Sequence, residues 1–287
     1  MLQTEPKTEA RPIFQSPGGS MIHLSDQEFT QLVEYIRGNF GINLSKKRLL
    51  IEARMFSVLT EKKLSSFTEY FELLKKGGPE ELNTLLNKLT TNHTYFMREP
   101  AHFDFMKQRF LPEMEKSNSE KVLRIWSAGC STGEEAYTAI MVMKDYFGMG
   151  SSWDYRILAT DISTQVLDNA QIGIYSQESL RNIPDTWERR YFKKVEEQTF
   201  QLSEEIRKEV IFRRFNLMDP FPFQKKFDLI FCRNVMIYFD QQTKNELISK
   251  FYQMLKPGGY LFIGHSETVQ RETVAFKYVE PSIYQKG

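Results

Sequence analysis

The sequence predicts an α/β fold in which a mostly parallel sheet is covered by helices and preceded by a small helical domain. After about residue 120, short apolar runs typical of buried strands alternate with segments of helical periodicity, which is the pattern of a parallel sheet with helical crossovers. Before residue 90, apolar residues recur every three to four positions, as on packed helices. We therefore expect a disordered leader over 1–20, a helical domain over 21–90, a linker and connecting helix over 91–120 and an α/β domain over 121–287.

The helical domain carries its own start and stop signals. Ser25 and Glu28 form a capping box ahead of an apolar stripe, and Gly41 can end that helix in a left-handed conformation. Ser66 and Glu69 form a second box. With two further leucine-rich stripes, the pattern predicts four helices.

Four apolar runs predict strands of the main sheet, namely "VLRIWSA", "YRILATD", "FDLIFCRN" and "GYLFIGH". Helices are expected over 134–147, 163–172 and 241–255. The polar stretch at about 191–215 contains the runs "YFKKVEEQTFQL" and "EVIFRRF" and is too short for a crossover helix, so we expect a small antiparallel β insertion there. The final "FKYVEPSIYQK" predicts one last strand, entering the sheet antiparallel.

Composition excludes several classes of protein. A formal net charge of +1 gives no global bias toward nucleic acid or membrane. The only cysteines, Cys130 and Cys232, fit no disulfide framework or CxxC pattern, which favours a reducing compartment, the cytoplasm. No apolar run approaches the roughly 18 residues that span a bilayer, and there is no signal-peptide pattern. The four histidines show no metal-ligand or triad spacing, so no metal site is expected.

The segment "IWSAGCSTGEEAYTAIMV" runs from a predicted strand through a glycine turn into a helix. A dinucleotide site needs G-x-G-x-x-G, so that a pyrophosphate can rest on bare amides, whereas this turn reads G-C-S-T-G-E-E. Glu134 and Glu135 complement the helix dipole, yet they would repel a pyrophosphate and attract a cation. S-adenosylmethionine carries a sulfonium and an ammonium and no phosphate. From this stretch alone, helix capping and cofactor binding explain the two glutamates equally well.

Polar residues follow two other strands at the same edge of the predicted sheet. Asp161 ends "ILATD", where a carboxylate can accept both ribose hydroxyls of an adenosyl group. Its alternative role is the N-cap of the next helix, a role that Ser163 can take instead. Arg233, Asn234 and Tyr238 follow the strand "FDLIFC". These polar residues either have no common role, as in an ordinary loop, or line one ligand crevice. The second interpretation is favoured, because the predicted fold brings these strand ends to the same edge of the sheet.

Six segments, taken in order, resemble the bacterial chemotaxis receptor glutamate O-methyltransferases of the CheR family. They are "TNHTYFMRE" at 91–99, "WSAGCSTGEEAY" at 126–137, "ATDIS" at 159–163, "NLMDPFPF" at 216–223, "FDLIFCRNVMIYFD" at 227–240 and "LKPGGYLFIGHSE" at 255–267. The resemblance spans about residues 22–284. It implies a Rossmann-like enzyme that uses S-adenosyl-L-methionine to esterify receptor glutamates and releases S-adenosyl-L-homocysteine.

The resemblance also implies the site residues. Arg98 and Tyr238 are expected beside the transferred methyl group. Glu134 or Glu135 would hold the methionine amino group, and Asp161 would hold the ribose. The other residues expected to bind the cofactor are Asn92, Thr94, Arg98, Asn216, Leu217, Arg233 and Asn234.

The implied partner is the cytoplasmic helical region of methyl-accepting chemotaxis receptors, and the enzyme is expected to be a monomer. Some family members dock the receptor tail on a glycine-containing loop of the β insertion, but no glycine occurs between Gly173 and Gly258. Direct recognition of the helical methylation region is therefore favoured. A basic cluster in the helical domain is a solvated surface or a docking face for glutamate-rich helices. It consists of Lys46, Lys47, Arg48, Arg54, Lys62 and Lys63.

The chemistry requires no general base, because a glutamate with a pKa of about 4.3 is already an anionic nucleophile at neutral pH. Cys130 has no identifiable base and is expected to be a small turn residue. Two alternatives remain. A nucleic-acid methyltransferase is disfavoured because no aromatic and basic stacking platform is apparent. A non-catalytic cofactor-binding regulatory module is disfavoured because Arg98 and Tyr238 are both present.

Overall fold

The structure, a computed structural model, describes residues 22–148, 150–270 and 274–287. The chain divides into two compact units, Met1–Thr90 and Thr91–Gly287. The leader expected over 1–20 lies outside the described residues. No helix in the described part of the chain is both long and apolar enough to cross a bilayer.

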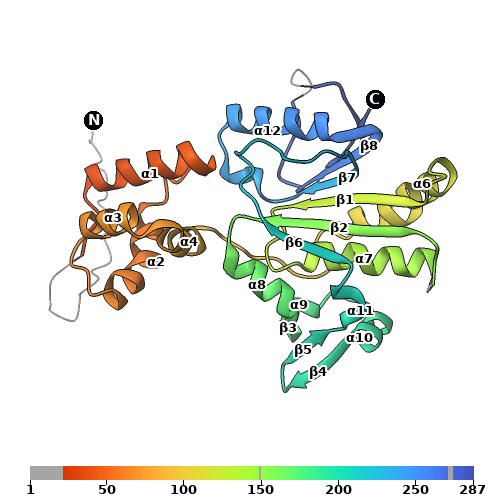
Figure 1. The fold of residues 1–287 in the computed structure, drawn as a ribbon, viewed down its shortest axis with the longest axis horizontal. Coiled ribbons are helices and arrows are strands. Elements are labelled where there is room, and N and C mark those ends of the chain that lie inside the picture. Colours follow the sequence, from red (N-terminus) through yellow and green to blue (C-terminus); the bar gives the residue numbers. More distant parts are fainter. Residues whose placement is uncertain (1–21, 149, 271–273) are drawn as a thin grey trace, which may run out of the picture. The chain divides into compact units, whose positions relative to one another are not determined.

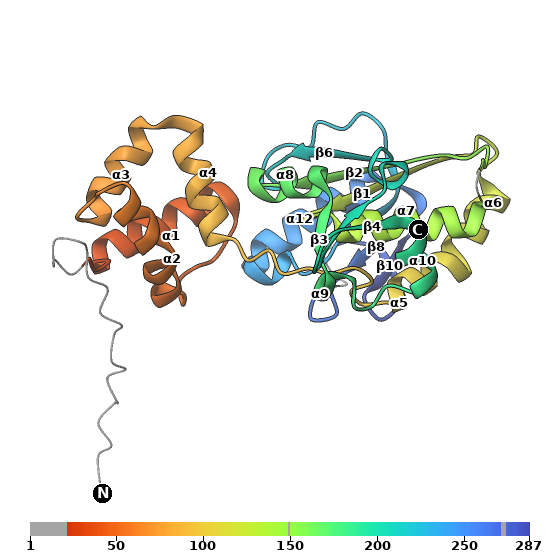
Figure 2. The ribbon, with the colours of Figure 1, turned by 90° about the horizontal axis from the view of Figure 1, so that it is seen from below.

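The first unit contains the four predicted helices, shown in red to orange in Figure 2. They are α1 (Asp26–Phe40), α2 (Arg48–Glu61), α3 (Phe67–Lys76) and α4 (Gly78–Leu89). The capping box of α1 is confirmed: the Ser25 hydroxyl accepts the Glu28 amide, and the Glu28 carboxylate accepts the Ser25 amide. Such a cap contributes about 1 kcal/mol. Gly41 ends the helix with φ 72°, as predicted.

The second capping box forms only in part. The Ser66 hydroxyl accepts the Glu69 amide at 3.2 Å, which confirms the N-cap of α3. The Glu69 carboxylate, however, accepts hydrogen bonds from the amide and hydroxyl of Ser65, at 2.8 and 2.7 Å. The preceding residue therefore replaces the N-cap residue as the partner of the glutamate.

The second unit is built on a seven-stranded sheet with the order β6-β2-β1-β7-β8-β10-β9. The strands are β1 (Val122–Ala128), β2 (Asp154–Asp161), β6 (Val210–Arg214), β7 (Phe227–Cys232), β8 (Leu255–Ile263), β9 (Phe276–Glu280) and β10 (Ile283–Lys286). The pairs among the first five strands in this order are all parallel, and β10 is antiparallel to both of its neighbours. The predicted mostly parallel sheet is confirmed.

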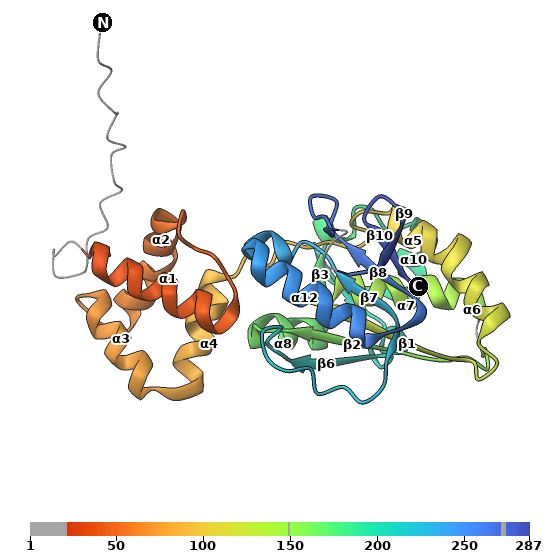
Figure 3. The same ribbon diagram turned by 90° about the horizontal axis from the view of Figure 1, so that it is seen from above.

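Helices cover both faces of this sheet. They include α7 (Glu134–Phe147), α8 (Thr164–Ile172) and α12 (Gln241–Met254), close to the predicted ranges. Figure 1 shows α12 on one face and α7 on the other, and Figure 3 shows α12 lying across β7. The connecting helix expected before β1 has three parts, α5 (Ala101–Phe105), a π-helical turn η1 (Met106–Phe110) and α6 (Leu111–Ser117).

The central strand β1 is fixed by a large aromatic cluster. Trp126 is fully buried and donates its indole N–H to the Thr160 hydroxyl at 2.9 Å. Five phenylalanine rings lie within about 6 Å of its ring, those of Phe215, Phe221, Phe223, Phe227 and Phe251. A buried aromatic residue of this size dominates local packing energy. The turn that follows β1 is therefore held on a rigid support.

The β insertion exists, but its boundaries differ from those expected. Its antiparallel sheet has the order β3-β5-β4, formed by β3 (Ile174–Ser176), β4 (Phe192–Glu196) and β5 (Thr199–Leu202). The assignment of "EVIFRRF" to this insertion was wrong, because β6 pairs in parallel with β2 in the main sheet. A half-buried edge strand alternates in polarity like an antiparallel strand, so periodicity cannot separate the two.

The prediction of one final strand was also wrong. The segment forms two antiparallel strands, β9 and β10, which pair with each other. They are joined at Pro281 and Ser282, and Ser282 adopts φ 64°. A two-residue connection with a left-handed residue makes a tight hairpin. The short apolar pattern spans both arms, which hides the reversal.

Candidate functional site

The glycine turn between β1 and α7 needs glycine at both ends. Gly129 and Gly133 adopt φ 83° and 91°. A Cβ atom at Gly129 would lie 2.4 Å from Val235 Cγ2. At Gly133 it would lie 3.0 Å from Ala170 and 3.1 Å from Phe212. Both the backbone conformation and the packing therefore exclude a side chain.

Asp161, at the end of β2, holds this turn in place. Its Oδ2 accepts the Ser131 amide at 2.9 Å, and its Oδ1 accepts the Ser163 amide at 3.0 Å. The prediction that Ser163 caps α8 is confirmed, since its hydroxyl accepts the Val166 amide. Asp161 is nevertheless engaged by the backbone rather than free, although each oxygen keeps a second lone pair. Burial raises the pKa of Asp161, while these amides oppose the rise.

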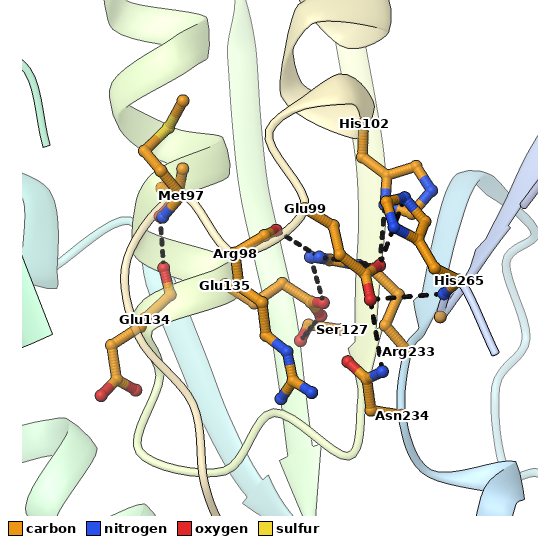
Figure 4. Close-up of polar contacts among 12 residues, drawn as sticks. Met97, Arg98, Glu99, His102, Ser127, Glu134, Glu135, Arg233, Asn234 and His265 are labelled. Atoms are coloured by element: carbon orange, nitrogen blue, oxygen red, sulfur yellow. Dashed lines mark hydrogen bonds and ion pairs between the residues drawn. The ribbon is translucent and has the colours of Figure 1, made fainter. Parts of the chain in front are cut away.

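The two glutamates of the first turn of α7 have different surroundings. Glu135 accepts the Ser127 hydroxyl at 2.6 Å on Oε1 and an Arg233 N–H at 3.0 Å on Oε2. Glu134 accepts the Thr132 hydroxyl at 2.7 Å. In Figure 4 the Glu134 side chain points away from Arg233. Burial raises the pKa of Glu134 to about 7, and it raises the pKa of Glu135 against the opposing effect of Arg233.

Glu134 lines a pocket of about 360 Å³ on the side of the turn that faces α8 and β3. The other lining residues are Thr132, Asn169, Ile172, Ile174, Tyr175, Ser176 and Ser179. The Tyr175 hydroxyl donates to the Thr132 carbonyl at 2.7 Å, which joins the insertion to the glycine turn.

Arg233, expected to line the cofactor pocket, is the buried centre of an ion-pair cluster. Its side chain is 2% exposed. Its NH1 lies 3.0 Å from Glu135 Oε2, while Nε and NH2 each lie 3.2 Å from Glu99 Oε2. NH2 also donates to the Arg98 carbonyl oxygen. These contacts define the Arg233 cluster, made of Arg233, Glu99 and Glu135 (Figure 4).

The sequence reasoning missed Glu99. This carboxylate also accepts the Asn234 side-chain amide and the His265 backbone amide, each at 3.3 Å. Burial works against its ionisation, but Arg233 and these donors prevail and hold the pKa of Glu99 below its ordinary value. Glu99 and Met97 both adopt φ 56°, an uncommon conformation for residues other than glycine. The only signal in the sequence was its place beside Arg98 in "TNHTYFMRE".

Two histidines, His102 and His265, also lie close together, although their spacing in the sequence indicated no common site. His102 Nδ1 lies 3.6 Å and His265 Nε2 lies 3.9 Å from Glu99 Oε2. Among the described residues, these three form the one group whose potential ligand atoms all lie within 4.8 Å of one another, close enough to hold a metal ion. Burial and the nearby Arg233 lower the pKa of His102 to about 3, so its ring is neutral. Because Arg233 binds the same oxygen of Glu99, a metal ion there would face a guanidinium, and electrostatics disfavours it.

The linker that contains Arg98 runs past the glycine turn. The Ser131 hydroxyl donates to the Asn92 carbonyl at 2.9 Å. Arg98 donates from NH1 to the His93 carbonyl at 2.7 Å, and its guanidinium lies 6.0 Å from the Tyr95 ring centroid. Thr94 lies between these contacts in the same linker. Asn92 thus contacts the glycine turn, whereas the Arg98 guanidinium contacts residues of its own linker.

The remaining expected residues follow β6 and β7. Asn216 accepts the Met218 amide at 3.1 Å on its side-chain oxygen, and Leu217 is buried. Lys250 on α12 donates to the Met218 carbonyl at 2.9 Å, which fixes this loop. Tyr238 is half-buried at the end of a short 3₁₀ helix, η2 (Met236–Tyr238).

Comparison with known families agrees with this architecture. The model described as "CheR methyltransferase, SAM binding domain" matches residues 92–284, and "CheR methyltransferase, all-alpha domain" matches residues 27–90. The chain belongs to the CheR methyltransferase family. S-adenosylmethionine is therefore its cofactor. The residues present fit it, because the turn gathers the carboxylates of Glu134, Glu135 and Asp161, which suit an ammonium, a sulfonium and ribose hydroxyls but not a phosphate.

The similarity to curated members of the family extends over nearly the whole chain. A chemotaxis protein methyltransferase of Borreliella burgdorferi is 47% identical over 273 residues, covering 93% of this chain and 96% of that protein. Chemotaxis protein methyltransferase 2 of Vibrio cholerae is 34% identical, covering 89% and 90%. The chemotaxis protein methyltransferase of Escherichia coli is 37% identical, covering 85% of each chain.

Proposed function

We propose that this methyltransferase acts on chemotaxis receptors, where it converts side-chain carboxylates of glutamates into methyl esters for sensory adaptation. The observation that supports this most directly is the near full-length similarity to relatives named chemotaxis protein methyltransferase. The cytoplasmic, helical part of the receptors is the partner that this chemistry implies. The two family domains span residues 27–90 and 92–284, which leaves little of the chain for an unrelated activity.

The sheet order supports one orientation of the cofactor. Asn216 and Leu217 follow β6, on the far side of Asp161 from β7. The adenine is therefore assigned to the β6 end, and Asp161 on β2 holds the ribose. The methionine end then lies toward β7, where Arg233 and Asn234 follow the strand. Ligands of open α/β sheets occupy this carboxyl edge.

This orientation favours Glu135 over Glu134 as the acceptor of the methionine ammonium. Glu135 bonds to Ser127 on β1 and to Arg233 after β7, so it stands at the methionine end. Glu134 instead faces the pocket beside α8 and β3. Arg233 acts through Glu135 by favouring the ionised form of its carboxylate against the effect of burial and by orienting it. Asn92, Thr94, Arg98 and Asn234 complete the assigned site.

The chain's own residues then need only align a carboxylate. The bound cofactor supplies an electrophilic methyl group on a sulfonium. An incoming glutamate is anionic at neutral pH, so no proton has to be removed. Arg98 offers a guanidinium and Tyr238 a phenol, and both are suitable donors for orienting a carboxylate oxygen and reducing its hydration.

The product tests the proposal. Receptor-containing membranes would be incubated with the protein and a radioactive methyl donor and then treated with mild alkali, which cleaves a methyl ester and releases volatile methanol. We expect volatile counts with wild-type protein and counts reduced at least about tenfold with Tyr238→Phe or Arg98→Lys, at nearly unchanged cofactor affinity. Label that resists alkali, or that appears on nucleic acid, would rule out glutamate esterification.

Only part of the basic cluster predicted from the sequence is assigned to the proposed receptor-docking face of the helical unit. Arg48 pairs with Asp26, and Lys62 pairs with Glu81 at 2.7 Å. Arg54 donates to the carbonyls of Lys88 and Leu89 at the end of α4 and to that of Thr90, which follows the helix, at 2.9 Å. These three cations therefore support the helical unit itself. The remaining exposed residues of the cluster are Lys46, Lys47 and Lys63.

Charge reversal of Lys46, Lys47 and Lys63 should slow receptor methylation about tenfold without changing cofactor affinity, because opposite charge speeds encounter with glutamate-rich helices. Raising the salt concentration should slow the wild-type reaction in the same way. Lys116→Glu, at an exposed position on α6, is the control. Equal methylation rates in the triple variant and the control would mean that these lysines form a solvated surface and do not contribute to receptor docking.

A further inference from the structure

Glu267 lies in the loop after β8 and belongs to none of the contacts assigned above. Its carboxylate is buried, at 7% exposure. Oε2 accepts the Gly264 amide at 2.6 Å and the Asn234 amide at 3.0 Å. Oε1 accepts the Ile237 amide at 3.1 Å. One carboxylate thus joins its own loop to the loop after β7, and we name this contact the Glu267 clasp.

The clasp holds the loop that carries two assigned site residues. Asn234 is bonded directly through its backbone amide, and Tyr238 follows Ile237, the other bonded residue. Asn234 adopts φ 58°, a left-handed conformation that asparagine tolerates better than most residues other than glycine. Hydrogen bonds from amides to an ionised carboxylate are among the stronger ones in proteins. Glu267 therefore fixes the backbone of a loop that has little regular structure of its own.

The packing around Gly264 gives an independent sign that the two loops must meet closely. A Cβ atom at Gly264 would lie 2.6 Å from Asn234 Nδ2, 2.8 Å from Asn234 N and 2.9 Å from Glu267 Oε2. Any side chain would push the Asn234 loop away from the Glu267 carboxylate. Glycine is needed here for the close approach.

The same loop is also held by a second carboxylate. Glu99 accepts the Asn234 side-chain amide at 3.3 Å, so Asn234 is fixed by Glu267 through its backbone and by Glu99 through its side chain. Glu99 lies next to Arg98 in the linker. The two carboxylates together set the loop after β7 against the linker that supplies Arg98.

We propose that Glu267 is a positioning residue for methyl transfer: it holds the backbone of residues 234–238 so that Asn234 and Tyr238 face the cofactor and the incoming carboxylate. The role of these two residues rests on the proposed function. The clasp itself rests only on the three hydrogen bonds and the Gly264 packing.

Two variants should weaken the Glu267 clasp in different ways, one by changing the carboxylate and the other by changing the packing at Gly264. Glu267→Gln keeps the shape of the side chain but turns an NH₂ group toward an amide N–H. Gly264→Ala inserts a methyl group between the two loops without removing any polar group. Gly38→Ala adds the same methyl group to α1, where nothing lies within 4 Å of the new atom. It is the matched control, and all three proteins would first be checked for cooperative thermal unfolding.

Amide hydrogen exchange at Asn234 and Ile237 measures the clasp directly, whatever the substrate is. We expect exchange at both amides to speed up about tenfold or more in Glu267→Gln and Gly264→Ala, and to remain unchanged in Gly38→Ala. Receptor methylation should fall about tenfold or more in turnover, while affinity for S-adenosylhomocysteine should fall less than turnover, because Asn234 is one cofactor contact among several and Asp161 and Glu135 lie on other elements. If Glu267→Gln does not fold, Gly264→Ala gives the same measurements.

Unchanged exchange at Asn234 and Ile237 would overturn the clasp. Faster exchange with wild-type turnover would overturn the positioning role. A wild-type protein that methylates no receptor would refute the proposed function instead, and the exchange measurement would still decide the clasp.

Discussion

The two sides of the first turn of α7 show how the same residue type takes different roles in adjacent positions. On the side facing β7, Glu135 is compensated by Arg233 and bonded to Ser127. On the side facing α8 and β3, Glu134 has a hydroxyl partner, Thr132, and lines a pocket. Successive helix positions point about 100° apart, so neighbouring glutamates meet different elements. The difference shows that the position on the helix, rather than the residue type, decides whether a glutamate here is compensated by a cation.

Among the variants that test this difference between the two glutamates, removal of the Arg233 guanidinium should have the largest effect, a loss of folding stability. Arg233→Met would leave the carboxylates of Glu99 and Glu135 buried without their cation, and the free energy of unfolding should fall by about 3–5 kcal/mol. Denaturant unfolding at neutral pH measures it. Arg156→Met, at an exposed position on β2, is the control and should change stability by less than about 0.5 kcal/mol. A similar loss of unfolding free energy in both variants would mean that the stability of the protein does not depend on compensation of the Glu99 and Glu135 charges by Arg233.

On the Glu134 side of the turn, where the described residues form no ion pair with the carboxylate, the free energy of unfolding should depend on pH. Because burial raises the pKa of Glu134 from 4.5 to about 7, the folded state binds this proton more tightly than the unfolded state. The stabilisation is fully present below about pH 4.5 and is lost as the pH rises through about 7, a difference of up to about 3 kcal/mol.

Glu134→Gln removes this titration, so the variant should gain stability relative to wild type as the pH rises from 4.5 to 8. Unfolding of the cofactor-free protein across this range would measure the difference. Parallel pH profiles of the two proteins would show that Glu134 titrates normally and that its side of the turn is well solvated.

The two glutamates should also differ in their contribution to cofactor binding, by a free energy smaller than the stability effects above. Glu135→Gln removes a charged partner of the methionine ammonium, and affinity for S-adenosylmethionine should fall about tenfold or more, as expected for a lost hydrogen bond to a charged group. Glu134→Gln should change it less than about twofold. Calorimetric titration with S-adenosylmethionine and S-adenosylhomocysteine measures both. A larger effect of Glu134→Gln would reverse the assignment and move the methionine end toward α8.

Local signals in the sequence were sufficient for elements whose ends are set within a few residues. The Ser25 and Glu28 box, the Gly41 cap and the Ser163 cap all act within one helical turn, so their chemistry can be read directly. The same holds for the buried strands, whose apolar runs fixed β1, β2, β7 and β8 to within a few residues. The errors arose at β6, whose pairing partner β2 lies far away in the sequence, and at the β9–β10 hairpin, where one apolar pattern runs through both strands and hides the turn.

The sequence by itself determined the fold class, the acidic character of the glycine turn and, through motif order, the family. Tertiary structure alone decided which acids are compensated. Arg233 meets Glu99 across 134 positions of sequence and Glu135 across 98, and Glu267 reaches Asn234 across 33. Such contacts depend on how strands and loops stack in three dimensions. Periodicity and capping act over a few residues, whereas the charge state of a buried carboxylate depends on whatever folding brings beside it.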